Sequence, residues 1–208
     1  MRKASRWMVA SLGVLVLGAA QAWAEQGTQS PPAVDPAKQA AMEALQKIGS
    51  PGESHKALEP FVGAWTYTAQ WWMGPEEQPQ TMTGTAANTL IYGGRFLRQE
   101  FHGNEAQEGQ PAFEGLGFTG YDNLRQEYQT VWLDNMATGM MVGAGQFDAT
   151  TKALTDQGEF SCPLTRETHR KFRSVFTVVD PDHTLYENYM SLPGGEYKAM
   201  EIRYTKAQ

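Results

Sequence analysis

The chain has 208 residues, of which 41% are hydrophobic, and it carries a formal net charge of −6. An acidic protein repels nucleic acid and anionic lipid surfaces, so we expect neither as a partner. The single cysteine, Cys162, excludes an internal disulfide, and folding must therefore rest on a hydrophobic core, which a chain of this length can supply.

The first 24 residues have the order of a secretory signal peptide. The basic start "MRKASR" precedes an apolar run from Trp7 to Ala20, and Ala22 and Ala24 then flank a bulky residue. We expect cleavage after Ala24 and a periplasmic or secreted mature protein. The apolar run is too short for a stable membrane span. Cleavage removes three cations and no acids, which changes the net charge from −6 to −9.

Residues 25–35 are almost free of apolar side chains, which indicates a disordered spacer. Asp35 and Pro36 then form an N-cap and a first helical position, and small apolar residues recur at helical spacing until Gly49 and Pro51. The sequence therefore predicts a helix over about residues 36–48, within an N-terminal helical segment over 36–60 that packs or caps the following domain.

From residue 61 to residue 208 the hydrophobic period changes to two, and turn-rich segments such as "YGG", "YDNL" and "DPDH" interrupt it. Ten segments of strand character lie between these turns, centred near residues 68, 85, 98, 117, 130, 142, 156, 174, 188 and 201. Ten short strands in succession predict an all-β domain, a ten-stranded antiparallel up-and-down barrel that leaves no exposed edge. A two-sheet sandwich is the alternative. A barrel of ten strands is wide enough to hold a cavity unless large side chains fill it.

The segment "FVGAW" places Gly63 two residues before Trp65 at the start of the first long strand. This resembles the Gly-x-Trp signature of the calycin superfamily, the lipocalins and fatty-acid-binding proteins. The resemblance implies that Trp65 has a structural role, in which it plugs one end of the barrel and packs against a basic residue of the last strand. Here that residue would be Arg203.

Four longer segments extend the resemblance. "GRFLRQEF", "FEGLGFTGYDN", "WLDNMATGMM" and "YKAMEIRYTK" together resemble the bacterial family catalogued as domain of unknown function 1579, over about residues 55–206. The resemblance implies a calycin-like barrel behind a signal peptide. It implies no activity, cofactor or catalytic residue.

Strand parity places several polar side chains on shared faces. Arg98 shares a face with Glu100, and Trp132 shares a face with Asp134. If these faces point inward, they hold the polar head of a ligand, or a carboxylate acts as a general acid or base. The residues expected to bind a ligand are Arg98, Glu100, Trp132, Asp134, Met140, Glu187 and Glu201. Outward orientation, or mutual pairing, is the alternative, since parity does not fix which face is inside.

The histidines are scattered and form no pair with metal-ligand spacing, so we predict no metal site. No cofactor is predicted, but haem needs only one axial histidine. Nitrobindin is a haem-carrying ten-stranded barrel, and His102 and His169 are the candidates for that ligand. The methionines indicate adaptable apolar packing rather than a soft-metal site. In the strands, Gly115 with Gly117 and Gly143 with Gly145 indicate curvature or room for a guest.

These features favour an exported barrel that holds a small, largely apolar or amphiphilic molecule in its cavity. An enzyme that uses Asp134 or Glu100 as a general acid or base is an alternative, and we prefer the binding function. A haem-binding, nitrobindin-like barrel and an envelope interaction module are further alternatives. The ligand, the oligomeric state and the role of Cys162 are left open by the sequence.

Overall fold

The structure is a computed structural model that describes residues 35–106 and 111–208. The predicted signal peptide and the spacer up to residue 34 lie outside the described residues. The chain divides into two compact units, one reaching Met42 and the other running from Glu43 to Gln208. Helix α1, Pro36–Ile48, forms over the predicted residues, and the Asp35 carboxylate caps it by accepting the Ala37 N–H at 2.9 Å.

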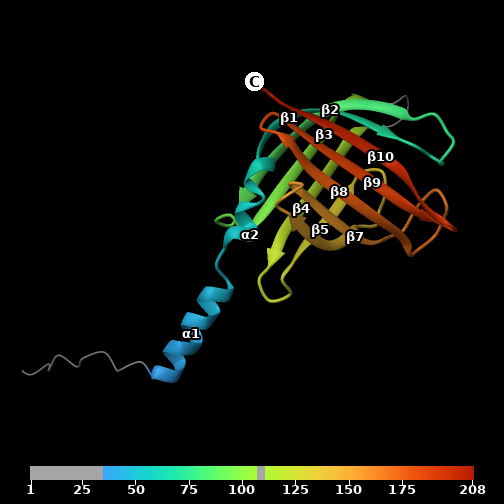
Figure 1. Cartoon of the computed structure of the whole chain (residues 1–208). Coiled ribbons are helices and arrows are strands. Elements are labelled where there is room, and N and C mark those ends of the chain that lie inside the picture. Colours follow the sequence, from blue (N-terminus) through green and yellow to red (C-terminus); the bar gives the residue numbers. More distant parts are fainter. Residues whose placement is uncertain (1–34, 107–110) are drawn as a thin grey trace, which may run out of the picture. The chain divides into compact units, whose positions relative to one another are not determined.

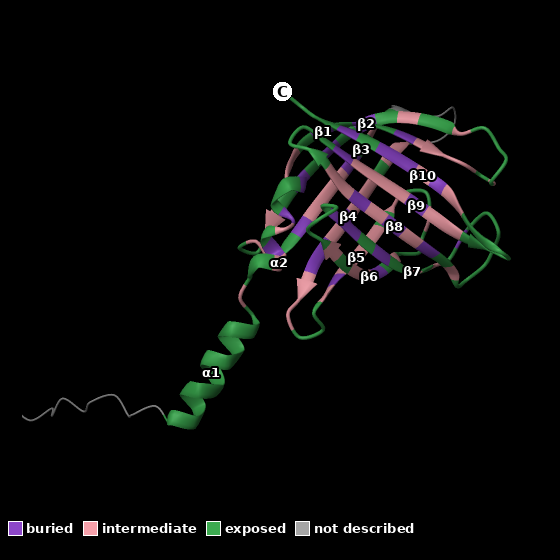
Figure 2. Cartoon of the chain, viewed as in Figure 1, coloured by how far each residue is buried: buried purple, intermediate pink, exposed green. Residues whose placement is uncertain are grey.

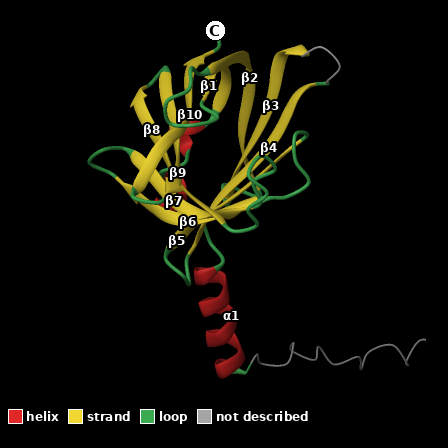
Figure 3. Cartoon of the chain, turned by 90° about the vertical axis from the view of Figure 1, so that its right-hand side faces the viewer, coloured by secondary structure: helices red, strands yellow, loops and turns green. Residues whose placement is uncertain are grey.

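A closed antiparallel barrel of ten strands follows, as predicted, so the sandwich alternative is wrong (Figures 1 and 3). Each strand pairs with its neighbours in sequence, and β1 pairs with β10 to close the barrel. The strands are β1 Gly63–Trp71, β2 Gln80–Ile91, β3 Phe96–Ala106, β4 Ala112–Asp122, β5 Glu127–Asp134, β6 Met141–Asp148, β7 Ala153–Phe160, β8 Arg170–Asp180, β9 His183–Leu192 and β10 Gly195–Lys206.

Buried and more exposed residues alternate along the strands (Figure 2), as expected where side chains point in turn to the interior and to the outer wall. In β1, Trp65 and Tyr67 are buried, whereas Thr66 and Thr68 are exposed. The same period of two runs through the other strands and gathers aromatic rings in the interior. Burial of these rings is the main source of stability in a domain without a disulfide.

Two short helical turns plug one end of the barrel. Helix α2 spans Glu53–Lys56, and the 3₁₀ turn η1 spans Glu59–Phe61. Phe61 is fully buried, and its ring centroid lies 4.2 Å from that of Phe176. The Tyr128 hydroxyl donates to the Ser54 carbonyl oxygen at 2.6 Å. We call this the plugged end, and the opposite end of the strands the mouth.

Trp65 lies at the plugged end and is 1% exposed. Its indole N–H donates to the Phe61 carbonyl oxygen at 3.1 Å. The cation over its ring is Lys206, whose Nζ lies 5.6 Å from the ring centroid, and not Arg203. The reason is parity: Lys206 pairs directly with Trp65, whereas Arg203 precedes the buried Tyr204 and therefore points outward.

Among the described residues, no helix has the length and apolar character needed to cross a membrane.

Candidate functional site

The inner wall changes character along the barrel axis. Deeper in the barrel many inward side chains are fully buried, as Leu97, Tyr128 and Leu154 illustrate. Towards the mouth, inward apolar side chains are only half-buried. We call these the mouth residues: Met82, Phe113, Trp132, Met141, Phe160 and Met190. Methionine and aromatic side chains adapt to varied apolar surfaces, so this ring is suited to contact a guest molecule.

Trp132 and Asp134 lie on the inner face of β5. Of the two orientations that the sequence allowed, this is the inward one, which a ligand-binding role requires. The Trp132 indole N–H donates to Asp134 Oδ2 at 2.8 Å, and Trp132 packs edge-on against Phe101. The indole covers two glycines of β4: a Cβ at Gly115 would lie 2.5 Å from the indole ring, and one at Gly117 would lie 3.2 Å from it. These two glycines therefore make room for a side chain of the protein.

A carboxylate that the sequence interpretation missed lies deeper in the barrel. Asp156 on β7 is 4% exposed. It accepts hydrogen bonds from the Thr130 hydroxyl at 2.5 Å and from the Ser174 hydroxyl. Burial raises the pKa of the Asp156 carboxyl, and these hydrogen bonds oppose the shift. Within the described part of the chain, no lysine, arginine or histidine pairs with this carboxylate.

Gly143 on β6 provides the space that Asp156 occupies. A Cβ at this position would lie 2.8 Å from Thr130 Oγ1 and 3.2 Å from Phe172 Cζ, and closer still to Asp156 Oδ2. Gly143 pairs with Thr130 on one side and with Gly158 on the other. The space at Gly143, predicted to serve curvature or a guest, is occupied by the protein's own buried acid.

Polar groups continue from Asp156 across the inner wall. Ser174 pairs with Asn188 of β9. The Asn188 side-chain N–H donates to the Tyr186 hydroxyl at 3.4 Å, and burial raises the pKa of Tyr186 to about 12. Asn188 is 3% exposed, and its Oδ1 has no hydrogen-bond partner among the described residues. Because a buried acceptor without a donor costs about 1–3 kcal/mol, this atom marks a place where a donor is missing.

Arg98 and Glu100 lie on the outer wall and not in the interior, where we expected them. Their neighbours Leu97 and Phe101 belong to the buried core, so alternation turns both charged side chains outward. Arg98 Nη2 lies 2.8 Å from Glu100 Oε2, and both side chains are about 40% exposed. The two side chains therefore form an ion pair with each other on the outer wall, which was the alternative prediction.

Glu187 and Glu201 also face the outer wall. Lys198 bridges them, with its Nζ 3.1 Å from Glu187 Oε1 and in contact with Glu201 Oε2. Arg203 Nη2 lies 2.6 Å from Glu201 Oε1. Burial opposes ionisation of Glu201, but the two cations outweigh it and lower the pKa of that carboxyl. This group is an outer ion cluster rather than part of an internal site.

The remaining candidates lie away from the interior. Met140 precedes β6 and is 60% exposed, whereas its neighbour Met141 is the one that faces inward. His102 points outward from β3, and the His169 side chain is 81% exposed. His55 is buried at the plugged end, where its Nδ1 accepts the Gly52 N–H. The described histidines therefore do not fit axial ligation of a haem inside the barrel.

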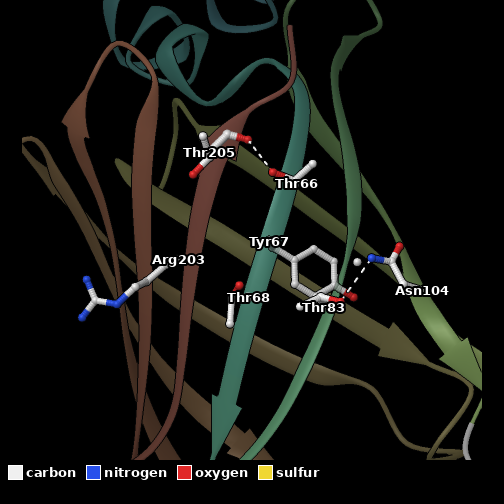
Figure 4. A pocket seen from close by; sticks show the side chains of 8 residues that line it. Thr66, Tyr67, Thr68, Thr83, Asn104, Arg203 and Thr205 are labelled. Carbon is white, nitrogen blue, oxygen red and sulfur yellow. Dashed lines mark hydrogen bonds between the residues drawn. The ribbon is translucent and has the colours of Figure 1, made fainter.

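Two hollows lie on the outside of the barrel. The first, of about 320 Å³, is lined by outward side chains including Thr66, Thr83 and Arg203, and Figure 4 shows Arg203 directed away from the Tyr67 ring. The second, of about 310 Å³, lies at the plugged end beside Pro60 and Lys206. Within the described ranges no cluster of metal-ligating side chains occurs.

Asp156 could have been found from the sequence. It stands in "ALTDQGEF", where it shares parity with Leu154 and Phe160. The apolar face of a strand is the face that is buried, so an acid on that face is expected to be buried as well. This expectation needs no separate knowledge of which face points into the barrel.

One solved structure has a similar architecture. The crystal structure of Rv2717c from M. tuberculosis superposes with a TM-score of 0.55 at 12% identity, covering 76% of this chain and all of that one. At that identity the likeness shows the fold alone. A redesigned β-barrel matches at 14% identity with a TM-score of 0.36, covering 77% of this chain and all of that one.

No curated protein matches the chain. The family model described as "Protein of unknown function (DUF1579)" matches residues 50–206, which include the plug and all ten strands. The protein therefore belongs to the DUF1579 family.

Proposed function

We propose that this protein is an exported binding protein whose barrel mouth holds the apolar part of a small amphiphilic molecule. One observation carries the proposal: the mouth residues face inward yet stay half-buried, while rings deeper in the barrel, such as Tyr67, Tyr128 and Tyr204, are fully buried. Apolar side chains that line a concave surface and keep access to solvent gain free energy when a ligand covers them.

The site proposed here is shallower than the cavity expected from the strand count. Large rings, including Phe61, Tyr67 and Tyr204, fill the plugged half, so the ligand would enter from the mouth and stop above them. Trp132 would stack on the ligand, and its bond to Asp134 fixes the orientation of the indole. The polar part of the ligand would remain at the rim or reach the Asp156 group.

A pair of adjacent residues tests the site. Met141 faces inward at the mouth, whereas Val142 faces outward and is 51% exposed. Met141→Glu places a charge where the apolar part of the ligand would lie, and should weaken dodecanol binding about ten-fold or more in isothermal titration calorimetry. Val142→Glu, the matched control, should leave the affinity unchanged. Equal affinities for both variants would refute the proposal, and so would the failure of the unaltered protein to bind any of dodecanol, dodecylamine and dodecanoate.

Export is a separate part of the proposal, supported by the basic, apolar and small-residue order of residues 1–24. Intact-mass measurement of protein taken from the periplasm of its own host should show a chain that begins at Glu25. Native mass spectrometry of the same sample should show the added mass of a retained ligand. A full-length chain in the cytoplasm would contradict export.

A further inference from the structure

The Asp156 group combines a buried acid with a buried acceptor that has no donor. We define it as Thr130, Asp156, Ser174, Tyr186 and Asn188, which come from the inner faces of β5, β7, β8 and β9. Asp156 and Asn188 are 4% and 3% exposed, and Asn188 Oδ1 has no hydrogen-bond partner among the described residues. The group is therefore rich in acceptors and short of donors.

The charge of this group is equally unbalanced. The inward neighbours of Asp156 on β6 and β8 are Gly145 and Ser174, and those one step towards the mouth are Gly143 and Phe172. None of them carries a charge, and Tyr186 is the other titratable side chain that faces the carboxylate. A buried carboxylate without a cation is costly, because the two hydroxyl hydrogen bonds compensate its desolvation only in part.

From these observations we infer that the ligand is an amphiphilic amine, whose ammonium group binds at Asp156 and Asn188 while its apolar chain lies against the mouth residues. This inference rests on the proposed function and names the ligand class for the same site. An ammonium group supplies three donors and a positive charge, which are the two things that the Asp156 group lacks. Phe172 and Tyr186 add aromatic rings beside the cation.

The route to the carboxylate runs past one ring. Phe172 is the inward neighbour of Ser174 on the mouth side, and its Cζ lies beside Gly143 and the Asp156 carboxylate. A ligand that reaches Asp156 from the mouth must displace this ring. The paired glycines Gly143 and Gly158 carry no side chains of their own beside this ring, and the Asp156 carboxylate, Thr130 and Phe160 are its neighbours there.

Arg170 offers the opposite chemistry and must be distinguished by the test. Its side chain is 10% exposed at the mouth end of β8, and its Nη1 lies 3.4 Å from Glu167 and 3.2 Å from Thr165 Oγ1. Because the guanidinium already has an acidic partner, it is a weaker attractor for a ligand carboxylate than Asp156 is for an ammonium group. A fatty acid is therefore the comparison ligand.

The experiment compares dodecylamine, dodecanol and dodecanoate by isothermal titration calorimetry, each below its micelle concentration. Dodecylamine should bind at least about ten-fold more tightly than either of the others. Asp156→Asn, which keeps the shape and removes the charge, should reduce that preference to less than about three-fold. Asn188→Ala should weaken dodecylamine more than dodecanol. Glu159→Gln is the matched control, because Glu159 lies on the outer face of the same strand, and it should change nothing.

The outcomes separate the inference from the proposed function. Binding of dodecanol or dodecanoate as tight as that of dodecylamine, or an amine preference that survives Asp156→Asn, would overturn the amine assignment and leave the mouth as the binding site. If none of the three amphiphiles binds, the proposed function fails with it. Circular dichroism and urea unfolding of each variant verify that loss of binding is not loss of fold.

Discussion

Gly143→Ala tests the packing around the buried acid with one added methyl group. The new Cβ would lie 2.8 Å from Thr130 Oγ1 and 3.2 Å from Phe172 Cζ, and closer still to Asp156 Oδ2. Ordinary contacts between such atoms are about 3.5–4.0 Å. The carboxylate has to move, but hydrogen bonds from Thr130 and Ser174 hold both of its oxygens.

The size of the effect follows from three contributions. Overpacking of a core costs about 1–3 kcal/mol, and loss of one hydrogen bond to a buried carboxylate costs about 1.5–3 kcal/mol. The alanine restricts the unfolded chain and so offsets about 0.4–1 kcal/mol. We expect Gly143→Ala to lower the free energy of unfolding by about 1–4 kcal/mol, with the smaller figure applying if the carboxylate keeps both bonds.

A double-mutant cycle in urea assigns this cost to the carboxylate. Asp156→Ala removes the atom nearest to the added methyl group, so Gly143→Ala should cost at least about 1 kcal/mol less in that background. If the effects of the two substitutions are additive, Asp156 does not restrict the space available to the added methyl group. The explanation by a clash with the carboxylate would then be wrong. A cost below about 0.5 kcal/mol for Gly143→Ala alone would refute it as well.

Three further predictions concern charges. Because burial raises the pKa of Asp156, the stability that its protonated form contributes is complete below about pH 4 and is lost as the pH rises through the folded-state pKa. Asp156→Asn should therefore gain stability relative to the unaltered protein as the pH rises towards neutral; a constant difference in urea unfolding across this range would contradict it. Lys206→Met should lower the free energy of unfolding by about 0.5–1 kcal/mol, and by less in a Trp65→Phe background, whereas equal costs would exclude the cation–π contact. Replacing both Arg98 and Glu100 with glutamine should change the free energy of unfolding by less than about 1 kcal/mol and leave the dodecanol affinity unaltered in calorimetry. A weaker affinity would show that these side chains act inside the barrel.

The fold was predictable because each local signal agreed with the others. All ten predicted strand centres fall within observed strands, and the predicted helix coincides with α1. Alternation of apolar and polar residues fixes which side chains share a face, and turn residues fix where each strand ends. Closure follows because ten antiparallel strands in sequence leave two edge strands, β1 and β10. Pairing these two strands satisfies the backbone N–H and C=O groups that each edge would otherwise expose.

The site was less predictable because parity leaves the inner face undetermined for a strand that is polar on both sides. In β3 the sequence attracts attention to Arg98 and Glu100, but the apolar residues Leu97 and Phe101 decide the orientation. The same rule, applied to β7, would have turned Asp156 inward. Residues that stand out by charge are thus a poor guide to the interior, and the apolar residues beside them are a better one.

Glycines determine what the interior of this barrel can contain. Gly84 lies beneath the Tyr67 ring, Gly115 lies beneath the Trp132 indole, and Gly143 lies beside the Asp156 carboxylate. In each case a larger side chain from a neighbouring strand occupies the space that a Cβ of the glycine would take. A glycine in these strands therefore lies beside a bulky or charged side chain of another strand. A wide barrel can therefore be filled at its plugged end without very large residues at every position. At Gly143 the group that takes the space is a carboxylate, which fills the volume but leaves a charge without a partner. For this reason the chemical specificity of the barrel is expected there, and the glycine and the acid should be altered together in any redesign of the site.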